Sequence, residues 1–557
     1  AMLAAALRIS PVLANLLVQR GIDTVEKAEK FFKPSLADLH DPFLMKDMEK
    51  AVERVERAVA NQEKIMVYGD YDVDGCTAVA LVYKFLRQIG HKNLMFYIPD
   101  RYTEGYGVSI KGIDYAAENG FSLMLITDCG IKAVEKVKYA NSKQVDIIIC
   151  DHHTPGDTLP EAIAVLDPQR PDCPYPYKWL SGCGVSFKLV QAHSLKHNLP
   201  MSELYKLLDL LCVSIASDIV PITGENRILA YFGLQQLNSN PSLGLKTIIK
   251  ISGIDKEITI NDIVFRIGPR INAAGRVESG RKSVELLTAD EKCSAAGIAS
   301  DINTFNDQRK KLDHDITEEA IRHINQSELE PSKKTTVLFN ANWHKGVIGI
   351  VASRLTESFY RPTIILTESN GLATGSARSV EGFDLYYAIS QCSEFLENYG
   401  GHKYAAGLTL KIENIEPFKQ KFERIVRETI DDEMLTPQIN IDAKIKLTDI
   451  TPDLYHMLQK FAPFGPNNTI PVFMTEKVTN FIGTKRVGRN NEHLKLVIVD
   501  DTRACNDRSG IGFGMGHLYD KVNSGGFFDI CYTLQENEFM GKNDIQMIVK
   551  DIRLREE

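Results

Sequence analysis

The chain has 557 residues, a length that predicts about three or four domains. Apolar residues make up 44% of it and charged residues 25%, a balance typical of globular proteins that excludes a largely disordered or fibrous chain. The formal net charge of −8 argues against a nucleic-acid partner unless the basic groups are gathered in one place.

Residues 1–60 are predicted as an N-terminal helical segment of mixed charge. Between residues 61 and 281, short apolar runs rich in strand formers alternate with helix-favouring segments. The runs predicted as strands are residues 64–68, 123–126, 146–150 and 162–166. This alternation indicates a first α/β domain built on a parallel, doubly wound sheet that has helices on both faces.

The chain from residue 282 to 330 is polar and favours helix, so we expect one or two long connecting helices there. Residues 331–436 alternate strands and helices again and are predicted as a second α/β domain. Residues 437–557 carry about five short strands separated by polar turns, which is typical of a small barrel such as the OB-fold. The expected fold class is therefore α/β, with two α/β domains joined by a long helix and followed by an all-β, OB-like barrel.

No apolar run reaches the roughly 18 residues that a membrane-spanning helix needs, and the N-terminal stretch lacks the basic region of a secretory signal. The ten cysteines are irregularly spaced with no CxxC pair, so neither a disulfide framework nor a zinc cluster is expected. We therefore expect reduced thiols and a cytoplasmic protein that has no membrane partner.

Acidic residues and histidines gather where the predicted strands end, and one further aspartate ends a later apolar segment. These residues are Asp70, Asp72, Asp74, Asp128, Asp151, His152, His153 and Asp218. In an open parallel sheet the carboxyl ends of the strands form the ligand crevice, so residues distant in sequence converge on one edge. Carboxylates crowded into one crevice repel one another, and divalent cations offset this repulsion.

The kind of cation follows from the ligands. Oxygen ligands with one or two imidazoles suit Mn²⁺ or Mg²⁺ better than Zn²⁺, because no thiolate pattern accompanies them. Two such ions roughly 3.5–4 Å apart are the usual arrangement for phosphoryl transfer. Taken singly, Asp70 can equally be a helix cap, and a pair of histidines is usually a surface or core feature. The prediction of a two-metal centre therefore rests on the combination.

Several segments together resemble a known family. Residues 70–75, 127–130, 151–153 and 217–220 resemble the four ordered motifs of the DHH phosphoesterase superfamily. Residues 400–407, GGHKYAAG, resemble the signature of its DHH-associated second domain. Four further segments resemble one branch, the RecJ single-strand-specific exonucleases: residues 101–107, 270–276, 343–349 and 464–466. The resemblance covers nearly the whole chain and adds a role for each matching position.

The implied metal ligands are Asp72, Asp74, Asp128, His152 and Asp218, with Asp128 as the bridge and Asp70 as a ligand or a neighbour of one. The implied catalytic residues are Asp128, His152 and His153, of which His153 contacts the scissile phosphate or orients a ligand. Tyr68 stands where the related type II pyrophosphatases have a histidine, which argues against a pyrophosphatase.

The resemblance also implies contacts to the substrate. They are Arg101, Arg270, Asn272, Arg276, His344, Ser376, Arg378, Gly401 and His402. Arginine presents a planar fork that matches phosphate oxygens, and glycine lets the backbone approach a phosphate closely. Whether Lys345 and Lys403 take part stays open. The chain departs from the family pattern within residues 464–468, where relatives often carry a second glycine.

The implied function is a metal-dependent exonuclease on single-stranded DNA that uses two Mn²⁺ or Mg²⁺ ions. By resemblance it degrades the strand from 5′ to 3′, releases 5′-mononucleotides and serves DNA recombination and repair. The resemblance further implies a monomer that contacts single-strand-binding protein and a RecQ-type helicase.

Two alternatives remain at this stage. One is a DHH-family phosphodiesterase that cleaves short oligonucleotides or cyclic dinucleotides, and the other is a catalytically inactive replication scaffold. The long connecting segment and the C-terminal barrel speak against the first, and the intact carboxylate and histidine set speaks against the second. For a nucleic-acid substrate, the net charge of −8 predicts a confined basic channel on an otherwise acidic surface.

Overall fold

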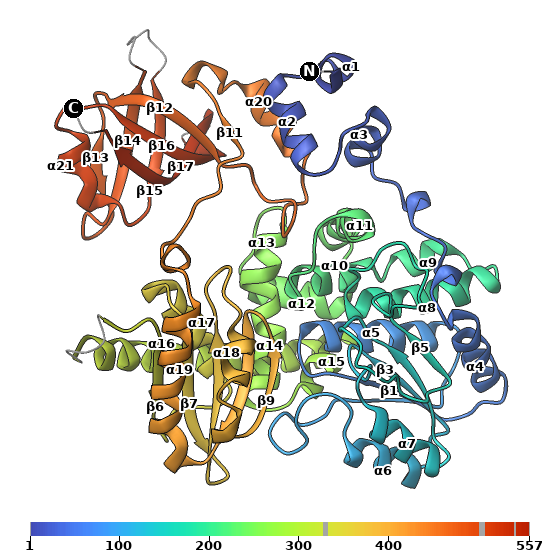
Figure 1. Ribbon diagram of the computed structural model, residues 1–557. Helices are drawn as coiled ribbons and strands as arrows, with labels where there is room; N and C mark the ends of the chain where they lie inside the picture. The colour runs from blue at the N-terminus through green and yellow to red at the C-terminus, as the bar shows by residue number, and fades with distance from the viewer. Residues whose placement is uncertain (1, 327–331, 501–506, 540–541, 556–557) are drawn as a thin grey trace.

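The computed structural model describes residues 2–326, 332–500, 507–539 and 542–555. Figure 1 shows two α/β domains side by side, with the C-terminal barrel set above them. The three N-terminal helices lie against the barrel, far from the sheet that follows them in sequence. Across the described ranges, none of the helices combines the length and the apolar character needed to cross a membrane.

The N-terminal segment divides between two parts of the molecule. Its elements are α1 (Met2–Leu7), α2 (Pro11–Gln19), α3 (Val25–Phe32), η1 (Leu36–Asp38), η2 (Pro42–Leu44) and α4 (Met48–Ala60). Leu16 and Leu17 of α2 share a core with the C-terminal barrel, whereas Val52 and Val55 of α4 belong to the core of the first α/β domain. Residues 1–60 are helical, as expected, but do not form one unit.

The first domain is built on a parallel sheet of strand order β2-β1-β3-β4-β5. The strands are β1 (Ile65–Gly69), β2 (Leu94–Tyr97), β3 (Leu123–Thr127), β4 (Asp146–Cys150) and β5 (Ala164–Leu166). The helices that cover it are α5 (Val73–Gln88), α6 (Ile110–Glu118), α7 (Val134–Ser142) and α8 (Gly182–Lys196). Ile65 and Val67 pack with α4, α5 and α8, while Met66 and Tyr68 pack with α6 and α7. The predicted doubly wound sheet is confirmed.

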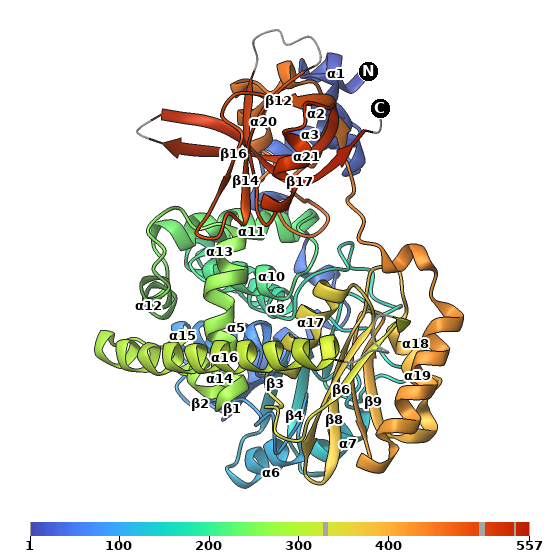
Figure 2. The same cartoon turned by 90° about the vertical axis from the view of Figure 1, so that its left-hand side faces the viewer.

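A helical half completes this domain and leads into the connector. Its elements are α9 (Met201–Tyr205), α10 (Leu208–Ser217), α11 (Gly224–Ser239), α12 (Leu243–Ile251), α13 (Ile260–Asp262), the π-helix η3 (Ile263–Ile267), α14 (Gly268–Val277) and α15 (Arg281–Leu287). The connector is one long helix, α16 (Lys292–Gln326), which crosses from one α/β domain to the other in Figure 2. Ala299 and Ile302 belong to the first core and Ile316 and Ile324 to another, so this helix joins the two domains rigidly.

The second α/β domain has a mixed sheet of order β6-β7-β8-β10-β9, in which only β6 and β7 run parallel. The strands are β6 (Thr336–Phe339), β7 (Thr363–Ser369), β8 (Leu372–Arg378), β9 (Leu396–His402) and β10 (Ala405–Leu410). The helices are α17 (Ile348–Phe359), α18 (Leu385–Ser390) and α19 (Ile415–Thr429), with the short turns η5 (Ser393–Phe395), η6 (Ile412–Asn414) and η7 (Asp432–Leu435). Ile365 packs with α17, and Ile364 and Leu366 pack with α18 and α19.

The C-terminal part is all-β with a few short helices. Its strands are β11 (Ala443–Lys444), β12 (Phe473–Asn480), β13 (Lys485–Val487), β14 (His493–Val499), β15 (Arg508–Gly512), β16 (Phe528–Phe539) and β17 (Lys542–Leu554). The helices are η8 (Leu447–Asp449), α20 (Pro452–Gln459), η9 (Gly516–Leu518) and α21 (Tyr519–Val522). Besides the ladder β12-β16-β17-β15-β14, a pairing between β12 and β14 closes the ring, so the expected barrel is confirmed.

Candidate metal centre

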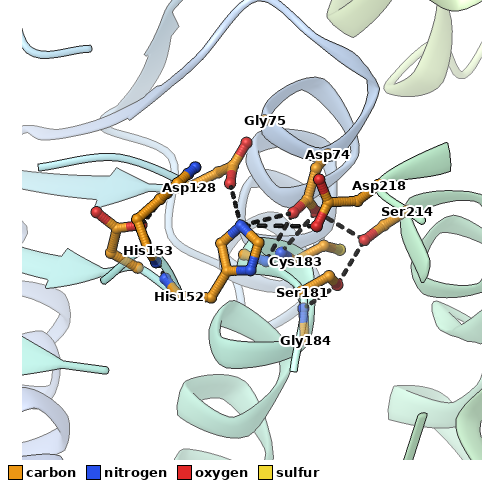
Figure 3. Close-up of polar contacts among 12 residues, drawn as sticks. Asp74, Gly75, Asp128, His152, His153, Ser181, Cys183, Gly184, Ser214 and Asp218 are labelled. Carbon is orange, nitrogen blue, oxygen red and sulfur yellow. Dashed lines mark hydrogen bonds and ion pairs between the residues drawn. The ribbon is translucent and has the colours of Figure 1, made fainter. Parts of the chain in front are cut away.

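The acidic residues converge because the strands that carry them run parallel and end on the same edge. Asp70 follows β1, Asp128 follows β3, and Asp151 and His152 follow β4. Asp218 reaches the same place from the end of α10. Figure 3 shows the carboxylates turned toward one imidazole ring. The crevice predicted at the strand ends is therefore present.

The ring of His152 lies at the centre of this group. Its Nε2 atom is 3.2 Å from Asp128 Oδ1, 3.6 Å from Asp218 Oδ2 and 3.7 Å from Asp74 Oδ2. Within the described residues, His152 Nε2 and Asp128 Oδ1 are buried and make no hydrogen bond of good geometry. Buried polar atoms without partners are costly, so this arrangement is what a cation-binding site needs.

Two sets of donor atoms are close enough to hold metal ions. One consists of Asp74, His152 and Asp218, and the other of Asp128, His152 and His153; within each set the donor atoms lie within 4.8 Å of one another. Carboxylate oxygens with an imidazole suit Mn²⁺ or Mg²⁺. The first set consists of predicted ligands, whereas the second contains His153, which is predicted to contact the phosphate, and neither set includes Asp72.

Asp74 is held in place by the start of α8. Its two carboxylate oxygens accept hydrogen bonds from the backbone N–H groups of Gly182 at 2.7 Å and Cys183 at 2.9 Å. The hydroxyl of Ser214 donates a third bond of 2.6 Å. A helix N-terminus favours a negative charge, so these donors keep Asp74 oriented toward the crevice.

Asp128 is constrained both by its own backbone conformation and by a neighbouring glycine. Its φ is +59°, in the left-handed region that few residues other than glycine enter. Gly182 lies against it so closely that a Cβ there would be 2.5 Å from Asp128 Oδ1. A side chain at position 182 would therefore push the central carboxylate out of the crevice.

Asp72 and Asp70 complete the acidic wall. Asp72 caps α5, because its Oδ1 accepts the Gly75 N–H at 2.9 Å. Asp70 is buried, and its Oδ1 has no hydrogen-bond partner among the described residues. The simpler explanation for Asp70 is that it caps a helix. In the structure the residue that caps α5 is Asp72 instead.

Asp151 has a different task from the other carboxylates. It orients His153, whose Nδ1 lies 2.7 Å from Asp151 Oδ1, and it accepts the Ile131 N–H at 2.8 Å. Burial alone would raise the pKa of Asp151, but the His153 ring and these donors hold it below its usual value. The other ring nitrogen of His153 contacts the Tyr106 hydroxyl at 3.2 Å. His153 is thus fixed at both nitrogens.

The carboxylates raise one another's pKa. Burial first, and neighbouring carboxylates second, raise the pKa of Asp70, Asp72 and Asp128, and likewise that of Asp218, above the usual value. For Asp128, the neighbouring charges that raise the pKa are those of Asp74, Asp72, Asp218 and Asp70. Several carboxylates therefore act on the same buried group.

A cluster of arginines faces the acidic wall. Arg276 is half-buried, and loss of solvent together with the positive charges of Arg101, Arg309 and Arg378 lowers its pKa to about 10. Asp72 acts in the opposite direction, which places this acidic residue beside the arginines. An anion such as a phosphate would offset the mutual repulsion of these arginines. Their influence on Arg276 favours the basic patch expected for a phosphate-bearing substrate.

Neighbouring segments shape this patch. Arg276 Nη1 donates to Gly346 O at 2.9 Å, and Arg378 Nη1 donates to Ser376 Oγ at 3.0 Å. His344 and Lys345 lie near Arg101, since burial and then its charge lower the pKa of both. These contacts bring the predicted residues Arg101, Arg276, His344, Ser376 and Arg378 together from both α/β domains.

The remaining predicted substrate residues differ in their placement. Burial first, and then the charges of Lys132 and His153, lower the pKa of His402. Gly401, with a φ of +146°, precedes it in β9. Arg270 donates to Asn303 Oδ1 and to a backbone carbonyl, so it ties α14 to α16, and Asn272 is half-buried on α14.

Sequence reasoning did not assign several residues that the site depends on. They are Tyr106, Gly182, Ser214 and Arg309. Tyr106 lies within residues 101–107, a segment that the family resemblance already includes, so its contact with His153 could have been suspected. The others come from helices that carry no pattern pointing to the strand ends.

Comparisons with known proteins follow the same division of the chain. Residues 64–215 match the model of the DHH family, N-terminal domain. Residues 332–428 match the DHHA1 domain, and residues 441–551 match the RecJ OB domain.

Relatives match the chain almost from end to end. It is 38% identical over 553 residues to the single-stranded-DNA-specific exonuclease RecJ of Bacillus subtilis, which covers 99% of this chain and 69% of the relative. It is 31% identical over 564 residues to the protein of the same name from Salmonella typhimurium, which covers 98% of this chain and 96% of the relative.

Solved structures agree with the fold and with the chemistry of the site. The crystal structure of RecJ in complex with Mn²⁺ from Thermus thermophilus matches with a TM-score of 0.85 at 26% identity, covering 100% of this chain and 78% of that one. The structure of RecJ from this organism with Mg²⁺ matches with a TM-score of 0.78 at 25% identity, covering 100% and 76%.

The close approach of Gly182 to Asp128 yields a prediction. Gly182→Ala should weaken Mn²⁺ binding about tenfold or more, because the new methyl group displaces the central carboxylate and disturbs the donors to Asp74. Isothermal titration of the metal-free protein with Mn²⁺ measures this. Gly297→Ala, on the exposed side of α16, is the control, because a Cβ there meets nothing within 4 Å. Equal affinities in the two variants would contradict the assignment.

Proposed function

The chain belongs to the RecJ family, and from this premise we propose how its residues carry out the reaction. It is a metal-dependent exonuclease that acts on single-stranded DNA and hydrolyses phosphodiester bonds. The observation that carries the proposal is the set of buried carboxylates around His152, with two overlapping groups of donor atoms that fit Mn²⁺ or Mg²⁺.

The residues that would hold the two ions are Asp72, Asp74, Asp128, His152 and Asp218, with Asp128 shared between them. Asp70 would be a ligand or would support one. When bound, the ions activate water for attack on phosphorus and offset the negative charge of the transition state. The chain's own work is to keep these side chains oriented, which the α8 N-terminus and Ser214 do for Asp74.

The remaining residues act on the phosphates. His153, fixed by Asp151 and Tyr106, would direct its ring toward the scissile phosphate. Arg101, Arg276 and Arg378 would grip the end of the strand, because a guanidinium fork matches phosphate oxygens. Both α/β domains contribute residues to this phosphate-binding group. The connecting helix α16 packs into both cores and so keeps the two domains aligned. Ser376, Gly401, His402 and His344 line the same place, while Arg270 and Asn272 would support it from α14.

The domain division is proposed as follows. Residues 61–281 form the catalytic domain, 282–330 the connection, 331–436 the phosphate-binding domain and 437–557 the nucleic-acid-binding barrel, with residues 1–60 as the N-terminal segment. The barrel offers exposed aromatic rings, Phe481, Phe513 and Phe527, on which bases can stack. Lys485 and Lys495, paired across β13 and β14, add positive charge.

Finer points rest on the family resemblance. They are the direction from 5′ to 3′, the release of 5′-mononucleotides, the role in recombination and repair, contact with single-strand-binding protein and a RecQ-type helicase, and the monomeric state. Cytoplasmic localisation is proposed because the described cysteines form no disulfide, which supports a reducing compartment.

The two alternatives are less favoured. A phosphodiesterase for short oligonucleotides or cyclic dinucleotides has no need of a barrel that matches the RecJ OB domain. A catalytically inactive scaffold has no need to crowd carboxylates with raised pKa values around a histidine.

A cleavage assay tests the proposed function. Single strands labelled at the 5′ or the 3′ end, duplex DNA and a dinucleotide are incubated with the protein, with Mn²⁺ and with EDTA. We expect Mn²⁺-dependent loss of the single strands that begins at the 5′ end. Asp128→Asn should reduce the rate by about 1,000-fold or more, since each metal contributes several kcal/mol to the transition state.

The matched control is Asp255→Asn, which changes an exposed aspartate outside the crevice and should keep the wild-type rate. A preference for the dinucleotide would overturn the proposal in favour of the small-substrate enzyme. Full activity in Asp128→Asn would overturn the two-metal assignment.

The barrel yields a second prediction. Phe513 is 61% exposed and stacks edge-on with His493, so Phe513→Ala should weaken binding of single-stranded DNA by about 1–3 kcal/mol, the worth of one stacked base. Fluorescence anisotropy with the Asp128→Asn protein measures this without cleavage. Ile412→Ala, which changes an exposed apolar residue of the second α/β domain, is the control. An unchanged affinity in Phe513→Ala would remove this ring from the binding surface.

A further inference from the structure

The barrel is joined to the catalytic domain through a short loop, residues 461–468, which we call the strap. Gly465 and Asn468 exchange backbone hydrogen bonds of 3.0 Å in both directions, so the loop closes on itself. The Asn468 side chain completes the closure by donating to Phe461 O at 2.8 Å and to Pro463 O at 2.9 Å. The strap is therefore a rigid turn, and it contains the segment that departs from the family pattern.

Arg227 of α11 fastens the strap to the catalytic domain. This arginine is 5% exposed; its Nη2 donates to Ala462 O at 2.9 Å and its Nη1 to Phe31 O at 2.7 Å. Its guanidinium also lies 3.8 Å from the centre of the Phe31 ring. Through these contacts one side chain joins α3, α11 and the strap.

The strap also contacts the segment that carries a metal-site residue. Ile222 N–H donates to Pro466 O at 2.8 Å. Gly465 lies so close to Ile222 that a Cβ on the glycine would be 2.5 Å from Ile222 Cγ1. Ile222 follows Asp218 by four residues, and Asp218 Oδ2 lies 3.6 Å from His152 Nε2. The strap is thus one short run of chain from the metal centre.

That short run is stiff. Pro221 limits the backbone, and its carbonyl accepts hydrogen bonds from the Tyr177 hydroxyl at 3.2 Å and from Asn226 Nδ2 at 3.1 Å. Ile219, next to Asp218, has a φ of +59°, which is rare for a β-branched residue. The Ile219 side chain is 66% exposed, so this conformation is held through its chain neighbours, Asp218 at the end of α10 and the hydrogen-bonded Pro221. A shift at Ile222 would therefore be passed on to Asp218.

We propose that the strap is a positioning element for the Asp218 carboxylate, so that docking of the C-terminal barrel on the catalytic domain sets the metal affinity of the centre. The inference rests on the proposed function, because it takes Asp218 as a metal ligand. It assigns Gly465, Pro466 and Arg227 to the reaction although none of them touches the substrate or the ions.

The test uses the full chain and Mn²⁺ alone, with free Mn²⁺ measured by electron paramagnetic resonance during titration of the metal-free protein. Gly465→Ala should weaken Mn²⁺ binding about tenfold, because the added methyl group displaces Ile222. The double variant Gly465→Ala with Ile222→Ala removes the atom in the way and should restore most of the affinity. Gly526→Ala is the matched control in the barrel, since a Cβ there meets nothing within 4 Å.

Each outcome decides a separate point. Wild-type affinity in a folded Gly465→Ala protein, or a loss that the double variant does not repair, would overturn the role of the strap. Repair by the double variant would exclude general misfolding as the cause. If the wild-type protein binds no Mn²⁺ at all, the proposed function fails and this inference fails with it, whereas the first two outcomes leave the proposed function intact.

Discussion

Mutual repulsion of buried carboxylates is the constraint on which the site depends. Asp70, Asp72, Asp74, Asp128 and Asp218 lie around one histidine at the carboxyl ends of parallel strands, where burial and their own charges raise the pKa of most of them. Without cations this arrangement opposes folding, since each carboxylate would be more stable in water. The surrounding helices and strands hold these carboxylates together in spite of the unfavourable free energy of burying them.

The way they do so explains features scattered along the chain. The start of α8 supplies two backbone donors and Gly182 supplies the space for Asp128. Arginines from both α/β domains act near the acidic residues. The net charge of −8 is a sum over the whole chain, so it does not show that acidic and basic side chains gather in separate, neighbouring groups. An acidic protein can therefore act on DNA, because metal ions and the arginines beside them would meet the strand where it is cut.

Much of the fold and of the site could be predicted from the sequence, because an apolar run that ends in acidic residues is a recognisable pattern for a strand end. Apolar runs followed by Asp128 or by Asp151 and His152 indicate both the sheet and the edge where its ligands lie. Long-range contacts have no such signal. Ser214, Arg227 and Gly465 act through neighbours far away in the chain, and the association of α1–α3 with the barrel depends on which apolar faces meet in space. Arg270 illustrates the same limit, since its side chain donates to Asn303 of α16 and to the Arg266 carbonyl.

The central claim is that the buried carboxylates exist to hold two divalent cations between the strand ends. The most direct measurement is an anomalous difference map from crystals of the protein grown with Mn²⁺ and recorded at the manganese absorption edge. The account predicts two peaks at the strand ends, surrounded by Asp72, Asp74, Asp128, His152 and Asp218, with Asp128 next to both peaks. A map with no peak there, or with a single ion bound away from Asp128, would contradict it.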